Sequence, residues 1–365
     1  MTGRVINHLL ASYSTSSRLS IGFLGGSVTK QGQMIPGFVE SLSNIGIKAA
    51  VTNYGIPATG PTYFSVCFEE IVTSQHNLFV LEFAVNDFEV PAVHFESIVS
   101  RVLAAQNSPG ILIIIHCGLK HWKKQGCSHI GAQQHESIAT KLEVPAVIVG
   151  PALSEYNSTG NNVTDLFRDG THPTQLGGEL IADLLHILLH RFVSYKADHC
   201  TGVSIHTRLA FRHKSIHSGP HCWSTRWNSS NFLIPYQMLG DWRFEINNNK
   251  YIEGKRSWIT TVNASLVEFI LPCKQETLRI FFTRNPDENS AGAIEVLRRD
   301  DENWITLGII NSYWKPNFRV IGSWAHPISI NPGIEDTHLR IINHGNPFGN
   351  TADGISEFRL NAISC

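Results

Sequence analysis

The sequence lacks an excess of charge of either sign. Its 365 residues carry 29 Lys and Arg against 30 Asp and Glu, and no run of basic residues stands out. Proteins that bind nucleic acid or anionic membranes concentrate Lys and Arg on one surface. We therefore expect neither of them as the main partner of this chain.

A long apolar segment is also missing. The longest strongly apolar run is centred on residues 111–115, whereas a membrane-spanning helix needs about 20 such residues. The amino terminus has no apolar stretch typical of a cleavable signal peptide, so we expect a soluble chain without a transmembrane segment. Localisation stays open, because N-x-S/T triplets favour the secretory pathway or the extracellular space. These triplets begin at Asn157, Asn162, Asn228 and Asn263.

The seven cysteines form no C-x-x-C pair, which disfavours zinc-ribbon and dithiol redox motifs. Disulfides in the second half are expected if the compartment is oxidising. The cysteines in or near that half are Cys200, Cys222, Cys273 and Cys365. Because the total is odd, at least one thiol is unpaired within a monomer. The histidines between His199 and Cys222 match no zinc-site spacing, so we expect neither a metal nor a cofactor.

The first half of the chain alternates short apolar strands with amphipathic helices. Strands are predicted over 19–24, 49–53, 78–83, 110–117 and 145–149. Near-continuous apolar strands indicate a parallel sheet covered on both faces, so this half is predicted to be a doubly wound α/β domain. Its last helix follows Pro173 and carries an apolar stripe from Leu180 to Phe192.

Near residue 200 the periodicity changes. From residue 265 the chain alternates as β-strands do, with segments near 266–271, 277–283, 293–298, 304–310, 318–323, 338–343 and 355–360. We predict a catalytic domain over 1–198, an irregular connection over 199–230 and an all-β sandwich or jelly-roll-like domain over 231–365. Seven of the eight tryptophans lie in the second half. Most are expected in the core, and the alternative is an exposed group that stacks on sugar rings.

Polar residues follow several predicted strands of the first half. They are Gly-Gly-Ser-Val-Thr at 25–29, Asn-Tyr-Gly at 53–55 and Val-Asn-Asp at 85–87. The carboxyl ends of parallel strands share one edge of a sheet, and Asp-Gly-Thr-His at 169–172 must reach that edge from a later loop. A serine becomes nucleophilic when an imidazole takes its proton and a carboxylate orients the imidazole. Ser27, His172 and Asp169 are the candidates for these roles.

These four blocks, in this order, resemble the SGNH hydrolases, also called GDSL-type esterases and lipases. The resemblance covers residues about 19–195 and implies a flavodoxin-like doubly wound sheet. It also implies that Ser27 attacks an ester carbonyl and that His172 is the base. In relatives the oxyanion hole corresponds to the backbone N–H groups of Ser27 and Gly55 with the side-chain amide of Asn86. Many members carry Asp where this chain has Gly26.

Simpler interpretations accompany each candidate. Ser27 alone would cap a helix, Gly55 would supply a turn with positive φ, and Asp87 beside Asn86 is expected to be structural. The G-x-S-x-G motif of α/β-hydrolases is absent. We predict a serine esterase acting on a small-molecule or glycan ester, with O-acetyl groups on a carbohydrate as the favoured substrate. The alternatives are an acyltransferase using the same serine and a catalytically silent glycan-binding protein.

Overall fold

The computed structural model divides the chain into two compact units, one of Met1–Ile56 with Ser74–His217 and one of Pro57–Thr73 with Ser218–Cys365. The predicted boundaries place residues 57–73 with the first domain. The segment joins the second unit because Cys67 is disulfide-bonded to Cys222 and Tyr63 packs edge-on against Phe281. The structure describes residues 18–72, 74–87, 90–199, 222–224, 233–247, 255–273, 277–283, 292–300, 303–313, 323–329, 337–345 and 358–365.

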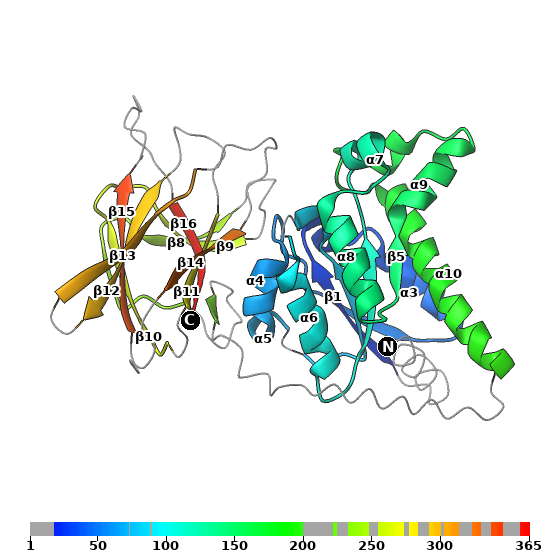
Figure 1. Ribbon diagram of the computed structural model, residues 1–365, viewed down its shortest axis with the longest axis horizontal. Helices are drawn as coiled ribbons and strands as arrows, with labels where there is room; N and C mark the ends of the chain where they lie inside the picture. The colour runs from blue at the N-terminus through cyan, green and yellow to red at the C-terminus, as the bar shows by residue number, and fades with distance from the viewer. Residues whose placement is uncertain are drawn as a thin grey trace. The chain divides into compact units, whose positions relative to one another are not determined.

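The first unit contains a five-stranded parallel sheet in the order β2-β1-β3-β4-β5 (Figure 1), the flavodoxin-like order. Its strands are β1 (Leu19–Gly25), β2 (Ala49–Asn53), β3 (Leu78–Glu82), β4 (Gly110–Ile115) and β5 (Ala146–Ile148). The predicted strands are confirmed to within two residues at each end. Phe23 pairs with Asn53, and Gly25 with Glu82, so β1, β2 and β3 end at the same edge.

Helices cover both faces of this sheet (Figure 1). Every residue of β4 is buried, which requires apolar cover on each side. Helices α3 and α10 share one core cluster with β1 and β4, whereas α6 and α8 contact β4 outside that cluster. The helices are α2 (Ser27–Gln31), α3 (Ile35–Asn44), α6 (Val93–Ala104), α7 (Leu119–Gln125), α8 (Ile130–Lys141), α9 (Val149–Ser158) and α10 (Gln175–His199), with 3-10 turns η1 (Ala84–Asn86) and η2 (Val163–Leu166).

The second unit is built from antiparallel strands in two sheets, β13-β12-β15-β10-β7 and β14-β11-β16-β9-β8, with β6 paired to β16. Side chains from both sheets, such as Phe269 and Ile280, form one hydrophobic cluster. The unit contains α4 (Pro61–Val66), α5 (Phe68–Ile71), β6 (Cys222–Ser224), β7 (Gln237–Leu239), β8 (Arg243–Asn247), β9 (Lys255–Thr260), β10 (Leu266–Leu271), β11 (Thr277–Thr283), β12 (Ala293–Asp300), β13 (Asn303–Asn311), β14 (Ser323–Ser329), β15 (Thr337–Gly345) and β16 (Phe358–Ser364).

The predicted strands at 266–271 and 277–283 are confirmed residue for residue. Strands β7, β8 and β9 were not predicted, and β6 lies within the stretch expected to be irregular. Most of the predicted strand at 318–323 lies outside the described residues, and β14 begins at its last residue, Ser323. Trp242 and Trp258 are buried, as expected for core tryptophans.

Three disulfides connect six cysteines: Cys67–Cys222, Cys117–Cys127 and Cys273–Cys365. The sequence indicates disulfides only in the second half. It does not indicate the bonds of Cys67 and of Cys117 with Cys127, because cysteine spacing alone does not reveal which thiols approach each other in space. Cys200 lies outside the described residues.

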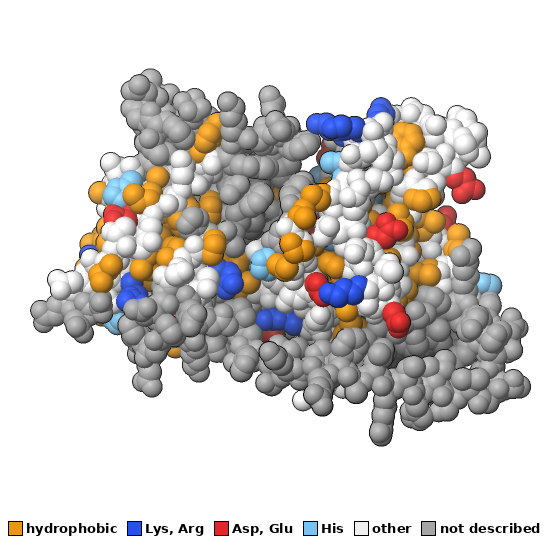
Figure 2. Space-filling model, in the orientation of Figure 1, with side chains coloured by type: hydrophobic (Ala, Val, Ile, Leu, Met, Phe, Trp, Pro, Cys, Tyr) orange, Lys and Arg blue, Asp and Glu red, His pale blue; other side chains and the backbone are white. Residues whose placement is uncertain are grey.

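The structure also tests the expectations about glycosylation triplets, membrane-spanning helices and surface charge. Asn157, Asn162 and Asn263 are exposed, and Asn228 lies outside the described residues. Within the described ranges, no helix combines the length and the apolar character needed to cross a bilayer. On the face drawn in Figure 2, basic side chains lie in small groups with acidic ones nearby.

Candidate active site

Ser27 is the first residue of α2 and follows two glycines, Gly25 at the end of β1 and Gly26 between strand and helix. A side chain on Gly25 would collide with the Thr29 hydroxyl and with the backbone carbonyl of Glu82. Glycine is therefore required where the strand turns into the helix, since only hydrogen fits there. The turn leaves Ser27 half-buried at the carboxyl edge of the sheet.

His172 lies within hydrogen-bonding distance of Ser27, although 145 residues separate them. The distance between Ser27 Oγ and His172 Nε2 is 2.7 Å. On the other side of the ring, Nδ1 is 2.8 Å from both carboxylate oxygens of Asp169. The carboxylate fixes the proton on Nδ1, so the Nε2 lone pair accepts the hydrogen of the Ser27 hydroxyl. The predicted convergence of these three side chains is confirmed.

The Asp169 carboxylate also holds the backbone of its own turn. Its Oδ1 accepts the N–H groups of Thr171, at 3.2 Å, and of His172, at 3.0 Å. Partial burial alone would raise the pKa of Asp169, but the hydrogen bonds from His172 and Thr171 outweigh it and the pKa falls below its usual value. The carboxylate therefore stays ionised where it faces the imidazole.

The loop that carries Asp169 and His172 is a closed turn. Phe167 and Pro173 form a β-bridge across its base, and the Arg168 N–H donates to the His172 carbonyl at 2.8 Å. Gly170 has φ of +82°, a conformation that favours glycine. The Asp-x-x-His spacing thus builds the carboxylate–imidazole pair locally.

Gly55 lies against the first turn of α2, but its N–H already has an acceptor. It donates to the side-chain oxygen of Asn53 at 2.8 Å. Gly55 is not among the glycines with positive φ, so the interpretation as a positive-φ turn is wrong. A side chain there would collide with the backbone of Thr29 and Lys30. Close approach of two backbone segments is the physical reason for glycine at this position.

Asn86 ends the 3-10 turn η1 after β3. Its side chain is half-buried, and its amide oxygen is buried without a hydrogen-bond partner among the described residues. The neighbouring Asp87 is fully buried and accepts a hydrogen bond from His135 Nε2 at 2.8 Å. The His135 ring in turn stacks on Phe95, with centroids 3.5 Å apart. The Asp87 carboxylate is therefore committed to His135, as its structural interpretation expected.

Two buried titratable residues near the site were not predicted. Glu82, at the end of β3, is 1% exposed, and its Oε2 accepts the Thr29 hydroxyl at 3.2 Å while Oε1 has no partner among the described residues. Burial raises its pKa to about 7, despite the hydrogen bonds from Thr29 that lower it. His116, just after β4, is the second. The only available signal was a single polar residue at the end of an apolar strand.

Side chains that could bind a metal are dispersed over the described part of the chain. Among the described residues, no group of three or more His, Cys, Asp or Glu side chains is arranged to hold a metal ion. The histidines from His206 to His221 lie outside the described part of the chain.

No protein-family model matches the chain, and no curated protein matches it in sequence. The solved structures that it resembles include a member of the lipolytic G-D-S-L family from Veillonella parvula, at 16% identity and a TM-score of 0.38, covering 47% of this chain and 99% of that chain. Another is the acetylxylan esterase Axe2 from Geobacillus stearothermophilus, at 17% identity and a TM-score of 0.40, with coverages of 48% and 94%. A family 3 carbohydrate esterase from Clostridium thermocellum has 14% identity, a TM-score of 0.39 and coverages of 49% and 98%. At these values the likeness assigns neither a family nor an activity.

Proposed function

We propose that the protein is a serine hydrolase that cleaves carboxylic esters, with Ser27, His172 and Asp169 as its catalytic residues. The observation that carries the proposal is the continuous chain of hydrogen bonds from Ser27 Oγ through the His172 ring to the Asp169 carboxylate. An oriented, neutral imidazole beside a serine hydroxyl is the arrangement that activates the oxygen as a nucleophile. The order of the four sequence blocks supports membership of the SGNH hydrolases and their fold.

In the first half of the reaction, Ser27 Oγ bonds to the ester carbonyl carbon while His172 Nε2 takes the hydroxyl proton. The carbon–oxygen bond to the alcohol then breaks, and His172 returns the proton to the leaving oxygen. Water next attacks the acyl-serine, giving a proton to His172, which passes it back to Ser27 Oγ as the carboxylic acid leaves. Asp169 stabilises the imidazolium in both steps.

The negative oxygen of each tetrahedral intermediate needs hydrogen-bond donors. We assign this role to the Ser27 N–H at the start of α2 and to the Asn86 side-chain amide. The Gly55 N–H would join them only by sharing its hydrogen with Asn53, its present acceptor. Gly55 contributes in addition by letting its loop approach α2 closely.

Fluorophosphonate labelling and steady-state kinetics test the proposal. The wild-type chain should be labelled at Ser27 and should hydrolyse a short-chain aryl acetate, and Ser27→Ala should lose both properties. Absence of labelling in the folded wild type, or full activity in Ser27→Ala, would contradict the proposal. A catalytically silent glycan-binding protein would give the first of these results.

We further propose an O-acetyl group on a carbohydrate as the substrate, because the chain adds a second unit of antiparallel sheets to the unit that holds the site. We interpret this unit as a β-sandwich accessory domain, since both sheets share one core. Release of free acetate from acetylated oligosaccharides, and not from long-chain acyl esters, is the expected result. Transfer of the acetyl group to an added sugar instead of water would identify an acyltransferase.

A further inference from the structure

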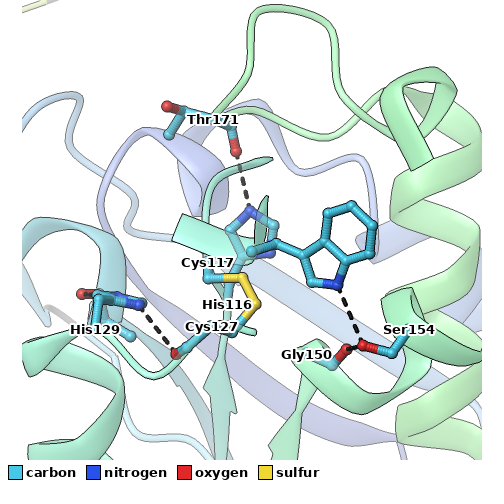
Figure 3. Close-up of a disulfide and its surroundings, with 9 residues drawn as sticks. His116, Cys117, Cys127, His129, Gly150, Ser154 and Thr171 are labelled. Atoms are coloured by element: carbon cyan, nitrogen blue, oxygen red, sulfur yellow. Dashed lines mark hydrogen bonds between the residues drawn. A yellow bond between two sulfur atoms is a disulfide. The ribbon is translucent and has the colours of Figure 1, made fainter. Parts of the chain in front are cut away.

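The turn that carries Asp169 and His172 is held from outside by donors that bind two of its own successive carbonyl groups. The Gly170 carbonyl accepts the backbone N–H of Leu119 at 2.7 Å. The Thr171 carbonyl accepts a hydrogen bond from His116 Nε2 at 3.0 Å (Figure 3). Both donors belong to the supporting loop, which we define as residues 116–119, from the end of β4 to the first residue of α7. The backbone of the turn is therefore held through its carbonyl groups by the supporting loop and through its N–H groups by the Asp169 carboxylate.

The supporting loop is itself firmly held. His116 is 1% exposed and Cys117 is completely buried. Cys117 forms a disulfide with Cys127, drawn beside His116 in Figure 3. A side chain on Gly118 would approach the Gly170 carbonyl to 2.9 Å, so the loop and the turn lie in direct backbone contact. A rigid neighbour of this kind transmits its own position to the turn.

His116 is suited to act as a neutral donor. Its pKa is lowered to about 4, chiefly by burial and in addition by the nearby His172 and His129, although the hydrogen bond to the Thr171 carbonyl acts to raise it. The neutral ring must carry its hydrogen on Nε2 to donate to that carbonyl, and Nδ1 is buried without a partner among the described residues. A neutral ring also adds no positive charge beside His172, which becomes a cation during the proposed reaction.

We propose that His116 is a positioning residue for ester hydrolysis, acting with the Leu119 N–H through the Gly170 and Thr171 carbonyls to keep His172 within reach of Ser27. This inference rests on the proposed function. His116 donates to the turn and not to the reacting atoms, so its loss should displace the imidazole without removing any catalytic group. A displacement of about 1 Å in such a site lowers the rate by up to about 10²-fold.

The test compares variants that do and do not retain the donor. In His116→Gln the side-chain nitrogen is four bonds from Cα, as Nε2 is in histidine, so it can reach the Thr171 carbonyl. In His116→Asn the nitrogen is one bond shorter, and in His116→Leu the donor is absent. We expect kcat for an aryl acetate to fall about 10- to 100-fold in the Asn and Leu variants with KM changed less than about threefold, and the Gln variant to stay within about fivefold of wild type.

Leu42→Ala provides a control for lost stability. Leu42 is fully buried near the end of α3, just before β2 begins, and so lies at the edge of the sheet opposite Ser27. This variant should unfold more easily but keep its kcat. The downfield proton NMR signal of the His172 Nδ1–H gives a second readout that does not depend on turnover. It should persist in His116→Gln and shift or broaden in His116→Asn.

The outcomes separate the two proposals. If the wild type neither labels with fluorophosphonate nor turns over, the proposed function fails. If the wild type is active but His116→Asn matches His116→Gln in kcat and in the NMR signal, the positioning role is refuted. Should His116→Leu fail to fold, the comparison of Gln with Asn still decides the question, because both are polar and differ in reach.

Discussion

The buried carboxyl of Glu82 makes the stability of the protein depend on pH in a defined way. Its pKa is raised by burial from 4.5 to about 7, and a pKa difference of one between the folded and the unfolded chain corresponds to about 1.4 kcal/mol. Below about pH 4.5 the carboxyl is protonated in both the folded and the unfolded chain, so it costs nothing. Between that pH and about 7 the unfolded chain loses the proton and the folded chain keeps it, so stability falls by about 3 kcal/mol as the pH rises.

Glu82→Gln removes this penalty while preserving shape and an acceptor for Thr29. The free energy of unfolding of the variant, relative to wild type, should therefore increase by about 3 kcal/mol between about pH 4 and pH 8. Urea unfolding followed by far-UV circular dichroism suits the measurement, because α10 and most other helices belong to the unit that contains Glu82. Glu40→Gln, at an exposed position on α3, controls for the loss of a negative charge. A difference that stays constant to within about 1 kcal/mol across this range would refute the reasoning.

Four further predictions concern the proposed site. Asp169→Asn should lower kcat by on the order of 10⁴-fold in aryl acetate assays, because the amide favours the wrong imidazole tautomer; a loss below about tenfold would contradict the assigned role. Asn86→Ala should cost on the order of 10² to 10³ in kcat with folding intact by circular dichroism, as expected for one lost oxyanion donor. Gly55→Ala should destabilise the protein by about 1–3 kcal/mol in urea, since the added methyl group meets the backbone of α2. Replacing Cys117 and Cys127 together by Ser should cost about 3 kcal/mol, the loop entropy for a separation of 10 residues, and should lower kcat in the same assay.

The periodicity of apolar residues was sufficient to predict strands that are either continuously buried or buried on alternate residues. Strand β4 is buried throughout, and β11 is buried on alternate residues up to Ile280. Such patterns can be detected in the sequence alone. Strand β7 was missed because it has only three residues and all of them are exposed, so it shows no alternation of buried and exposed positions. The assignment of residues 57–73 to the second unit depends on Cys67 meeting Cys222, a contact between residues 155 apart.

The candidate site divides in the same way. Asp169 and His172 form their pair within one turn, and Ser27 follows a strand whose end the glycines mark, so local spacing was enough to name all three as candidates. Glu82 and His116 escaped notice because each is one polar residue after an apolar run. Their partners Thr29 and Thr171 lie more than 50 residues away. Both residues stand out only because they are buried, and burial cannot be seen in the sequence before the chain folds.

The path of the chain between the two units has a practical consequence for dissecting the protein. The polypeptide passes from one unit to the other after Ile56, returns after Thr73 and leaves again after His217. A fragment truncated near residue 198 would retain α4 but lose the strands β11 and β14 against which α4 packs, and Cys67 would lose its disulfide partner Cys222. A single truncation point therefore cannot produce either unit with all of its residues. To express the units separately, residues 57–73 would have to be removed from the first unit and the gap between Ile56 and Ser74 closed. Experiments on the protein should therefore use the chain with both units.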